Sequence, residues 1–276
     1  PMSDNPLPDH LKTRCGVETD DELWGMILIE GNEFWRRNRA RYARVPTIPR
    51  CRNCHRPFEG VGGALLRITQ GIHKSDKNPN YCWGCYQFLS EVPGGAEVEL
   101  TMFFADIRGS TALAETMSAA EYGDLLNRFY QVAIDTLVLE DAFIDNLIGD
   151  EVAAMFVPGF AGPDHARRAI EAGRALLHKT GHGQAGDPWL PLGIGIHTGV
   201  AWVGAVGGAD GAATDFTALG DNVNITARLT SASATGEILA SEATIRAAGL
   251  EDARLEKREL VLKGKSQPVA VRVIEL

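Results

Sequence analysis

Apolar positions follow two different periods along the chain, and the first has helical spacing. It begins after Asp20, and its apolar members are Leu23, Trp24, Ile27, Leu28, Phe34 and Trp35. Pro46 and Pro49 end the pattern, since proline cannot continue a helix. The pattern predicts one long helix over residues 20–48, with the acids at 20 and 21 as capping residues.

The second pattern runs from residue 96 to the end and alternates strand-like with helix-like segments. It predicts strands over 98–105, 143–148, 151–156, 190–197 and 200–206, with short strands near 238, 260 and 271. Helices are expected over 119–139, 163–180 and 221–234, the last capped by Asp221. The alternation predicts an α+β fold in which helices pack on one sheet.

Glycine and proline divide the chain into four parts. Residues 1–19 are rich in proline and polar residues and predict a flexible leader, which precedes the helix of 20–48. Residues 49–93 form a small, glycine-rich unit that ends at the run Pro93-Gly94-Gly95. Residues 96–276 then form the large α+β domain.

The composition is that of a globular chain with an acidic balance. Its 276 residues are 45% hydrophobic, and the formal net charge of −9 argues against a general affinity for nucleic acid or anionic lipid. No apolar run reaches the roughly 18 residues that a membrane span needs, and the first 21 residues lack the pattern of a signal peptide. These features predict a cytoplasmic protein.

Two carboxylates, Asp106 and Asp150, each follow an apolar strand at a turn that carries glycine. Carboxylates in this setting are typical ligands of Mg²⁺, which takes one or two of them beside substrate phosphates. Asn224 and Arg228 lie four residues apart on one face of a predicted helix, and arginine binds phosphate oxygens through its planar fork of donors. Taken singly, these residues also fit a helix cap, a hairpin turn and a solvated helix face.

Together these motifs resemble the class III nucleotidyl cyclases over about residues 97–276. The resemblance rests on Phe104-x-Asp106-Ile107-x-Gly109-Ser110-Thr111, Gly149-Asp150, the run from Gly193 to Gly199, Gly220-Asp221-x-Val223-Asn224-x-x-x-Arg228-Leu229 and Lys263-Gly264-Lys265. It implies a ferredoxin-like catalytic domain that converts a nucleoside triphosphate to a cyclic nucleotide and pyrophosphate.

The resemblance also implies a role for each residue. Asp106 and Asp150, with the Ile107 carbonyl, would hold two Mg²⁺ or Mn²⁺ ions at each site. Asn224 would orient the ribose and Arg228 would stabilise charge on the α-phosphate, while Lys263 would bind the triphosphate. In this family the metal acids and the Asn/Arg helix come from opposite protomers, so a homodimer with two shared sites is expected and a monomer should be inactive.

The base-reading positions of the family are Asn146 and Thr217 here. Members that use ATP usually have lysine at the first position and guanylate cyclases usually have an acid, whereas threonine at the second is common in bacterial adenylate cyclases. Asparagine fits neither pattern, although its amide both donates and accepts. ATP conversion to cyclic AMP is the favoured interpretation. Cyclic GMP, cyclic CMP and cyclic UMP remain alternatives.

The small unit contains two cysteine pairs, Cys51-x-x-Cys54 and Cys82-x-x-Cys85. Four thiolates in two such pairs suit tetrahedral Zn²⁺, so we expect a zinc-ribbon-like module with one structural zinc, and an iron–sulfur centre is the alternative. The fifth cysteine, Cys15, is expected to be a free thiol in the leader.

Basic and aromatic residues in the helix of 20–48 allow several interpretations. The basic ones are Arg36, Arg37, Arg39, Arg41 and Arg44. Beside a zinc module they raise nucleic-acid binding as an alternative, but a solvated helix face is favoured because the whole chain is acidic. Trp24, Phe34 and Trp35 are expected to pack against a dimer partner, so that helix and module together fix dimer geometry.

A weakly active cyclase-like scaffold is the remaining alternative to an active cyclase.

Overall fold

The computed structural model describes residues 18–31, 33–45, 49–92, 94–207, 215–251, 254–261 and 268–276. Cys15, most of the predicted leader and Lys263 lie outside these residues, as do the side chains of Phe34 and Trp35. In the part of the chain that is described, no helix is both long and apolar enough to span a membrane.

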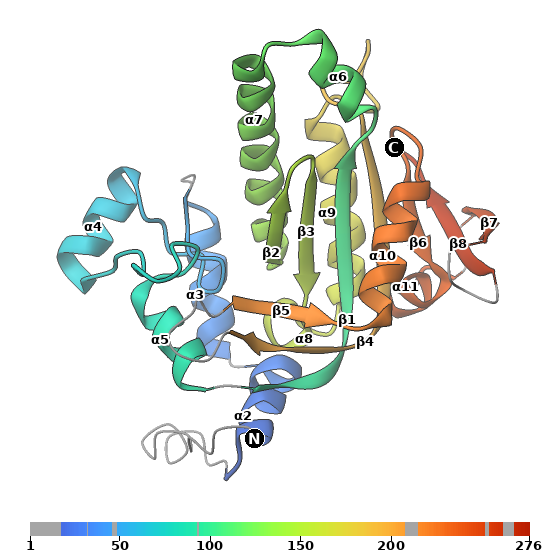
Figure 1. The fold of residues 1–276 in the computed structure, drawn as a ribbon. Coiled ribbons are helices and arrows are strands. Elements are labelled where there is room, and N and C mark those ends of the chain that lie inside the picture. The colour runs from blue at the N-terminus through green and yellow to red at the C-terminus, as the bar shows by residue number, and fades with distance from the viewer. Residues whose placement is uncertain are drawn as a thin grey trace.

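A twisted sheet forms the centre of the molecule (Figure 1). Its strands follow the order β2-β3-β1-β4-β6-β8-β7, with β5 paired to β4, and β4 and β6 are the parallel neighbours. The strands are β1 (Gly94–Ile107), β2 (Phe143–Ile148), β3 (Glu151–Phe156), β4 (Leu192–Val206), β5 (Asp215–Leu219), β6 (Ile238–Ser241), β7 (Glu256–Leu260) and β8 (Val269–Ile274). This arrangement confirms the predicted α+β fold with helices on a sheet.

Two long helices cover one face of the sheet. They are α7 (Ala119–Leu137), extended by the short η2 (Val138–Glu140), and α9 (His165–Lys179). Their apolar faces bury Phe129 and Leu176 against Phe103 of β1 in one core. The short α6 (Ser110–Thr116) and α8 (Pro158–Ala161) connect these layers.

Helix α10 (Asp221–Ala232) packs on the opposite face over β4. It comes very close, because a Cβ on Gly195 would lie 2.4 Å from the backbone nitrogen of Thr230. Gly195 therefore allows the contact that sets the height of α10 above the sheet. The helix begins after Gly220, which is the N-cap residue in place of the predicted Asp221. The short α11 (Glu242–Ala247) follows β6.

The N-terminal segment is not the single helix that the apolar spacing predicts. It divides into α2 (Asp20–Gly25), the π-helical turn η1 (Met26–Glu30) and α3 (Glu33–Ala43). The break lies at Gly31, where φ is 69° and the backbone leaves the helical region. Thr19 caps α2 in a capping box with Glu22, so the predicted capping acids occupy the first turn.

The cysteine module (residues 49–92) is helical where a zinc ribbon would be made of strands. It contains α4 (Gly60–Gln70) and α5 (Trp83–Glu91), and only isolated bridges such as Lys74 with Cys82 represent β pairing within its described residues. In Figure 1 the module lies beside β2 and β5, on the flank away from β7 and β8.

The module, α2 and the sheet share one hydrophobic core. Trp24 is buried and stacks on Phe216 of β5 with a centroid distance of 5.8 Å, while Tyr81 of the module stacks near Phe143 of β2 at 6.5 Å. The prediction that Trp24 packs against a dimer partner is therefore wrong. Its surface is already covered by the chain's own sheet.

Candidate active site

Asp106 and Asp150 come together at one edge of the sheet. Asp106 ends β1 opposite Glu151 of β3, and the Ile107 amide donates to the Asp150 carbonyl at 3.1 Å. Asp106 near the end of β1 and Asp150 in the turn before β3 are therefore neighbours at the same end of the two strands. Burial, followed by the charge of Asp150, raises the pKa of Glu151, as expected for a place where negative charges concentrate.

Arg108 forms an ion pair with Asp106. Its Nη1 also donates to the Thr230 and Ser231 carbonyls, at 3.2 and 3.4 Å, so the same guanidinium holds the C-terminal end of α10. A cation at that end also suits the helix dipole. Arg108 thus provides positive charge beside a carboxylate that is suited to a divalent metal ion.

The turn that carries Asp150 has two central residues, Gly149 and Asp150, between the paired Ile148 and Glu151. Gly149 has φ 58°, which glycine adopts without strain and which matches the tight turns of β-hairpins. The Tyr130 hydroxyl of α7 donates to the Gly149 carbonyl and fixes the turn from the helical side.

Asn224 and Arg228 lie one turn apart on α10. Ile225 and Leu229 are buried against the sheet, whereas Asn224 is exposed and Arg228 is partly exposed. Within the described residues, no hydrogen bond or ion pair connects this pair with Asp106 or Asp150. The chain thus presents two groups of candidate residues, one of carboxylates and one of amide and guanidinium donors, and we call each group a half-site.

The base-reading positions lie on β2 and β5. Asn146 is exposed, and its Oδ1 accepts from the Leu147 amide at 2.9 Å, which leaves the Nδ2 hydrogens as donors. Thr217 lies opposite Gly204 of β4, and its hydroxyl contacts the carboxyl group of Asp145, not Asn146. Asp145 is a further polar residue beside these two positions, and the family motif does not mark it. The sequence signal for it was the pair of successive polar residues, Asp145 and Asn146, in an otherwise apolar strand.

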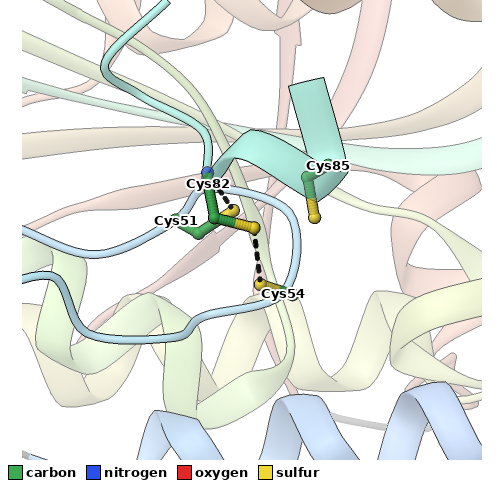
Figure 2. Close-up of side chains that lie close together, drawn as sticks. All are labelled: Cys51, Cys54, Cys82 and Cys85. Atoms are coloured by element: carbon green, nitrogen blue, oxygen red, sulfur yellow. Dashed lines mark hydrogen bonds between the residues drawn. The ribbon is translucent and has the colours of Figure 1, made fainter. Parts of the chain in front are cut away.

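Four cysteine side chains meet inside the module (Figure 2). Their sulfur atoms all lie within 4.8 Å of one another, and Cys54 and Cys82 are 3.7 Å apart. Tetrahedral zinc with bonds of about 2.3 Å requires sulfur separations of about 3.8 Å, so the donor set fits this metal. The Cys82 amide donates to Cys51 Sγ at 3.3 Å, a bond that stabilises thiolate charge.

Arg39 connects this cluster to the catalytic sheet. Its side chain is buried, donates to the Asn53 carbonyl between the first two cysteines, and donates to the Asp141 and Ala142 carbonyls at 3.2 Å each. His55 reaches the same Ala142 carbonyl at 3.2 Å through Nε2. Arg39 is therefore a structural contact. Its burial argues against treating the arginines of α3 as one solvated or nucleic-acid-binding face.

This fold and these half-sites define a nucleotidyl cyclase catalytic domain. Residues 95–274 match the family model described as the adenylate and guanylate cyclase catalytic domain, and the chain belongs to this family. Among solved structures, the guanylyl cyclase Cya2 aligns with a TM-score of 0.57 and 30% identity, covering 65% of this chain and 93% of that one. The adenylyl cyclase CyaB from P. aeruginosa aligns with a TM-score of 0.55 and 33% identity, covering 65% and 95%.

Curated relatives include two adenylate cyclases. An adenylate cyclase of Anabaena cylindrica is 29% identical over 192 residues, which are 66% of this chain and 38% of that protein. Adenylate cyclase 1 of Rhizobium meliloti is 31% identical over 136 residues, 48% of this chain and 20% of that protein. The chain thus spans well under half the length of these relatives, and the match lies in the catalytic domain.

Proposed function

We propose that the protein is an adenylate cyclase that converts ATP to 3′,5′-cyclic AMP and pyrophosphate. The observation that carries this proposal is the register that places Asp106 of β1 opposite Glu151 of β3, next to the turn that carries Asp150. The Asn224 and Arg228 pair on α10 supplies the complementary donors. Both halves lie within residues 95–274, which match the family model.

The proposed mechanism relies on positioning and charge. The ribose 3′-oxygen bonds to the α-phosphorus, the bond from that phosphorus to the pyrophosphate oxygen breaks, and the 3′-hydroxyl proton passes to water. Asp106, Asp150 and the Ile107 carbonyl would hold two Mg²⁺ or Mn²⁺ ions, which lower the pKa of the 3′-hydroxyl and offset triphosphate charge when bound. Asn224 would orient the ribose, and Arg228 would donate to the α-phosphate oxygens.

Each complete site is proposed to need two copies of the chain. Among the described residues, no hydrogen bond or ion pair joins the carboxylates to the Asn224 and Arg228 pair, which is consistent with each half meeting its complement in a second copy. A two-fold dimer would pair each half-site with the complementary half of the other copy. Lys263, which lies outside the described residues, would bind the triphosphate.

Adenine is the proposed base because Thr217 occupies the second base-reading position and Asn146 keeps amide donors free. An amide hydrogen can serve the acceptor N1 of adenine, which is the task of the longer lysine in many relatives. Among the similar proteins are both adenylyl and guanylyl cyclases, so the base requires a direct test.

The four-cysteine cluster is proposed to hold one structural Zn²⁺. Burial raises the pKa of Cys51, so four ionised thiols at this buried place need a cation. The metal would hold the two halves of the module together while the module packs on the sheet. Since helix α2 and the module pack on a sheet face that includes Phe143 of β2 and Phe216 of β5, we propose that they also fix the geometry of the dimer.

The decisive experiment is incubation with equimolar ATP, GTP, CTP and UTP and either Mg²⁺ or Mn²⁺, with products identified by mass spectrometry. Cyclic AMP should be the main product, and Asp106→Ala should form none. A cyclic product from another base would correct the substrate. Absence of every cyclic product with both metals, from folded dimeric protein, would refute the enzyme proposal.

A further inference from the structure

A β-bulge interrupts the strand that carries the first base-reading position. Ile144 of β2 pairs with Ala154 and Asn146 pairs with Ala153, so Asp145 is one extra residue between them. Such an insertion changes the direction of side chains at that point, and bulges are common beside functional sites. Here the bulge brings the Asp145 carboxyl to the Thr217 hydroxyl on β5.

The cysteine module holds this bulge in place. Arg52, between the first two cysteines, donates to the main-chain carbonyl of Asp145. Tyr81, directly before Cys82, donates its hydroxyl to the Asp215 carboxylate and accepts from the Phe216 amide at 3.2 Å. Residues next to both cysteine pairs therefore contact the two strands that carry base-reading positions.

Asp145 is an acid at the bulge, and its carboxyl group contacts the hydroxyl of Thr217 on β5. Its side chain is partly exposed, and burial raises its pKa to about 6 while the Thr217 hydroxyl and the charge of Arg52 oppose that shift, so the carboxyl group is ionised at neutral pH. Arg52 itself is bonded to the Asp145 carbonyl, so the carboxyl oxygens keep acceptor capacity beyond the single Thr217 hydroxyl. A carboxylate beside the base-reading threonine is suited to accept an N–H group from a ligand.

We propose that Asp145 is a specificity-determining residue that accepts a hydrogen bond from the exocyclic amino group of adenine. Thr217 and the Asn146 amide flank it, so that the amide can donate to the neighbouring ring nitrogen. This proposal rests on the proposed function, because it concerns the same nucleotide site. It assigns amino recognition to a residue outside the two positions that the family motif marks.

The test is nucleotide affinity in the full chain, which does not depend on turnover. Asp145→Asn keeps the main-chain carbonyl that Arg52 contacts, but it replaces a charged acceptor with an amide that can donate. We expect the dissociation constant for a non-cyclising ATP analogue, 3′-deoxy-ATP, to rise about tenfold, as for loss of one charge-assisted hydrogen bond. The dissociation constant for 3′-deoxy-GTP should change by less than about twofold or should fall.

A ligand without a base separates recognition from structural damage. Ribose 5′-triphosphate should bind wild type and Asp145→Asn equally, within about twofold. Glu171→Gln on α9 removes the same charge on the other face of the sheet and should leave every affinity unchanged. If Asp145→Asn fails to fold, Asp145→Ser serves as the second variant.

Two results would overturn the proposal. One is an unchanged ratio of ATP-analogue to GTP-analogue affinity in Asp145→Asn, and the other is an equal loss for ribose triphosphate. Failure of the proposed function would look different, because wild-type protein would then form no cyclic product while the binding comparison remained interpretable.

Discussion

The metal edge and the base-reading edge of this domain are built in different ways. The metal edge, Asp106 and Asp150, uses neighbouring strands of one sheet and a hairpin turn. The base-reading edge, Asp145, Asn146 and Thr217, depends on a bulge and on Arg52 and Tyr81 of the cysteine module. Under the proposed function, the reaction chemistry would be encoded locally, whereas base selectivity would depend on a segment far away in sequence.

The largest expected effect is on the metal edge. Asp106→Ala should lower the cyclisation rate at least about 1,000-fold, because several kcal/mol of charge stabilisation are lost. Affinity for ribose triphosphate without metal and the melting temperature should change little. Rates measured by product mass at saturating ATP, with circular dichroism as the folding control, check this.

Mixing tests whether the two half-sites come from different chains. An equimolar mixture of Asp106→Ala and Arg228→Ala proteins should recover about a quarter of the wild-type rate, since half of randomly mixed dimers contain one intact site. Each protein alone stays inactive. A mixture that remains as inactive as its components, after dimer exchange is demonstrated, would contradict the shared site.

The next effect is on the module. Cys82→Ser should reduce bound zinc from one per chain towards none and lower the melting temperature by about 10 °C or more, because metal binding supplies folding free energy. Zinc is measured by elemental analysis. Visible absorption with bound iron would instead identify an iron–sulfur centre.

Deleting residues 1–94 is a poorer test of the module's role than Cys82→Ser, since the deletion exposes the apolar sheet face under Trp24.

A smaller effect, on the KM for ATP, should distinguish the base-reading edge from the metal edge directly. Arg52→Ala removes the donor to the Asp145 carbonyl and should raise the ATP KM about tenfold with little change in kcat, the size expected for one lost hydrogen bond. Arg37→Ala, an exposed arginine paired with Glu33, is the matched control. A matching fall in kcat would place Arg52 in the chemistry instead. Zinc content should stay at one per chain.

The smallest effect is a pH dependence of stability. Burial, opposed by Thr217 and Arg52 and reinforced by Asp215, raises the pKa of Asp145 to about 6. The unfolded chain therefore loses this proton at lower pH than the folded chain, and stability falls as pH rises towards 6, by at most about 3 kcal/mol. Asp145→Asn should be more stable than wild type at pH 8, and the difference should shrink at pH 5. Melting temperatures at both pH values check this, and a pH-independent difference would contradict it.

The sequence predicted the strands, turn and helix that carry the contiguous motifs. The strand, turn and helix around Asp106, Asp150 and Asn224 follow from local alternation and glycine placement, and the α+β fold follows from their order. The cysteine pairs were equally readable, because short spacing alone brings such thiols together.

Structural features that depend on contacts between distant residues could not be predicted from the sequence in this way. The break at Gly31, the burial of Trp24 and the buried Arg39 each involve contacts with residues far away in the sequence. The bulge at Asp145 is similar, because strand register is settled by both neighbours and, here, by Arg52. Local propensity carries no information about these partners.

The core shared by the module and the sheet also limits how this protein can be recombined. Tyr81, Phe143 and Phe216 pack together across what sequence composition marks as a domain boundary. A chimera that joined this cyclase domain to a foreign N-terminal segment would leave β2 and β5 without their packing partners. Residues 18–92 and the sheet should therefore be exchanged, inherited and engineered as one unit.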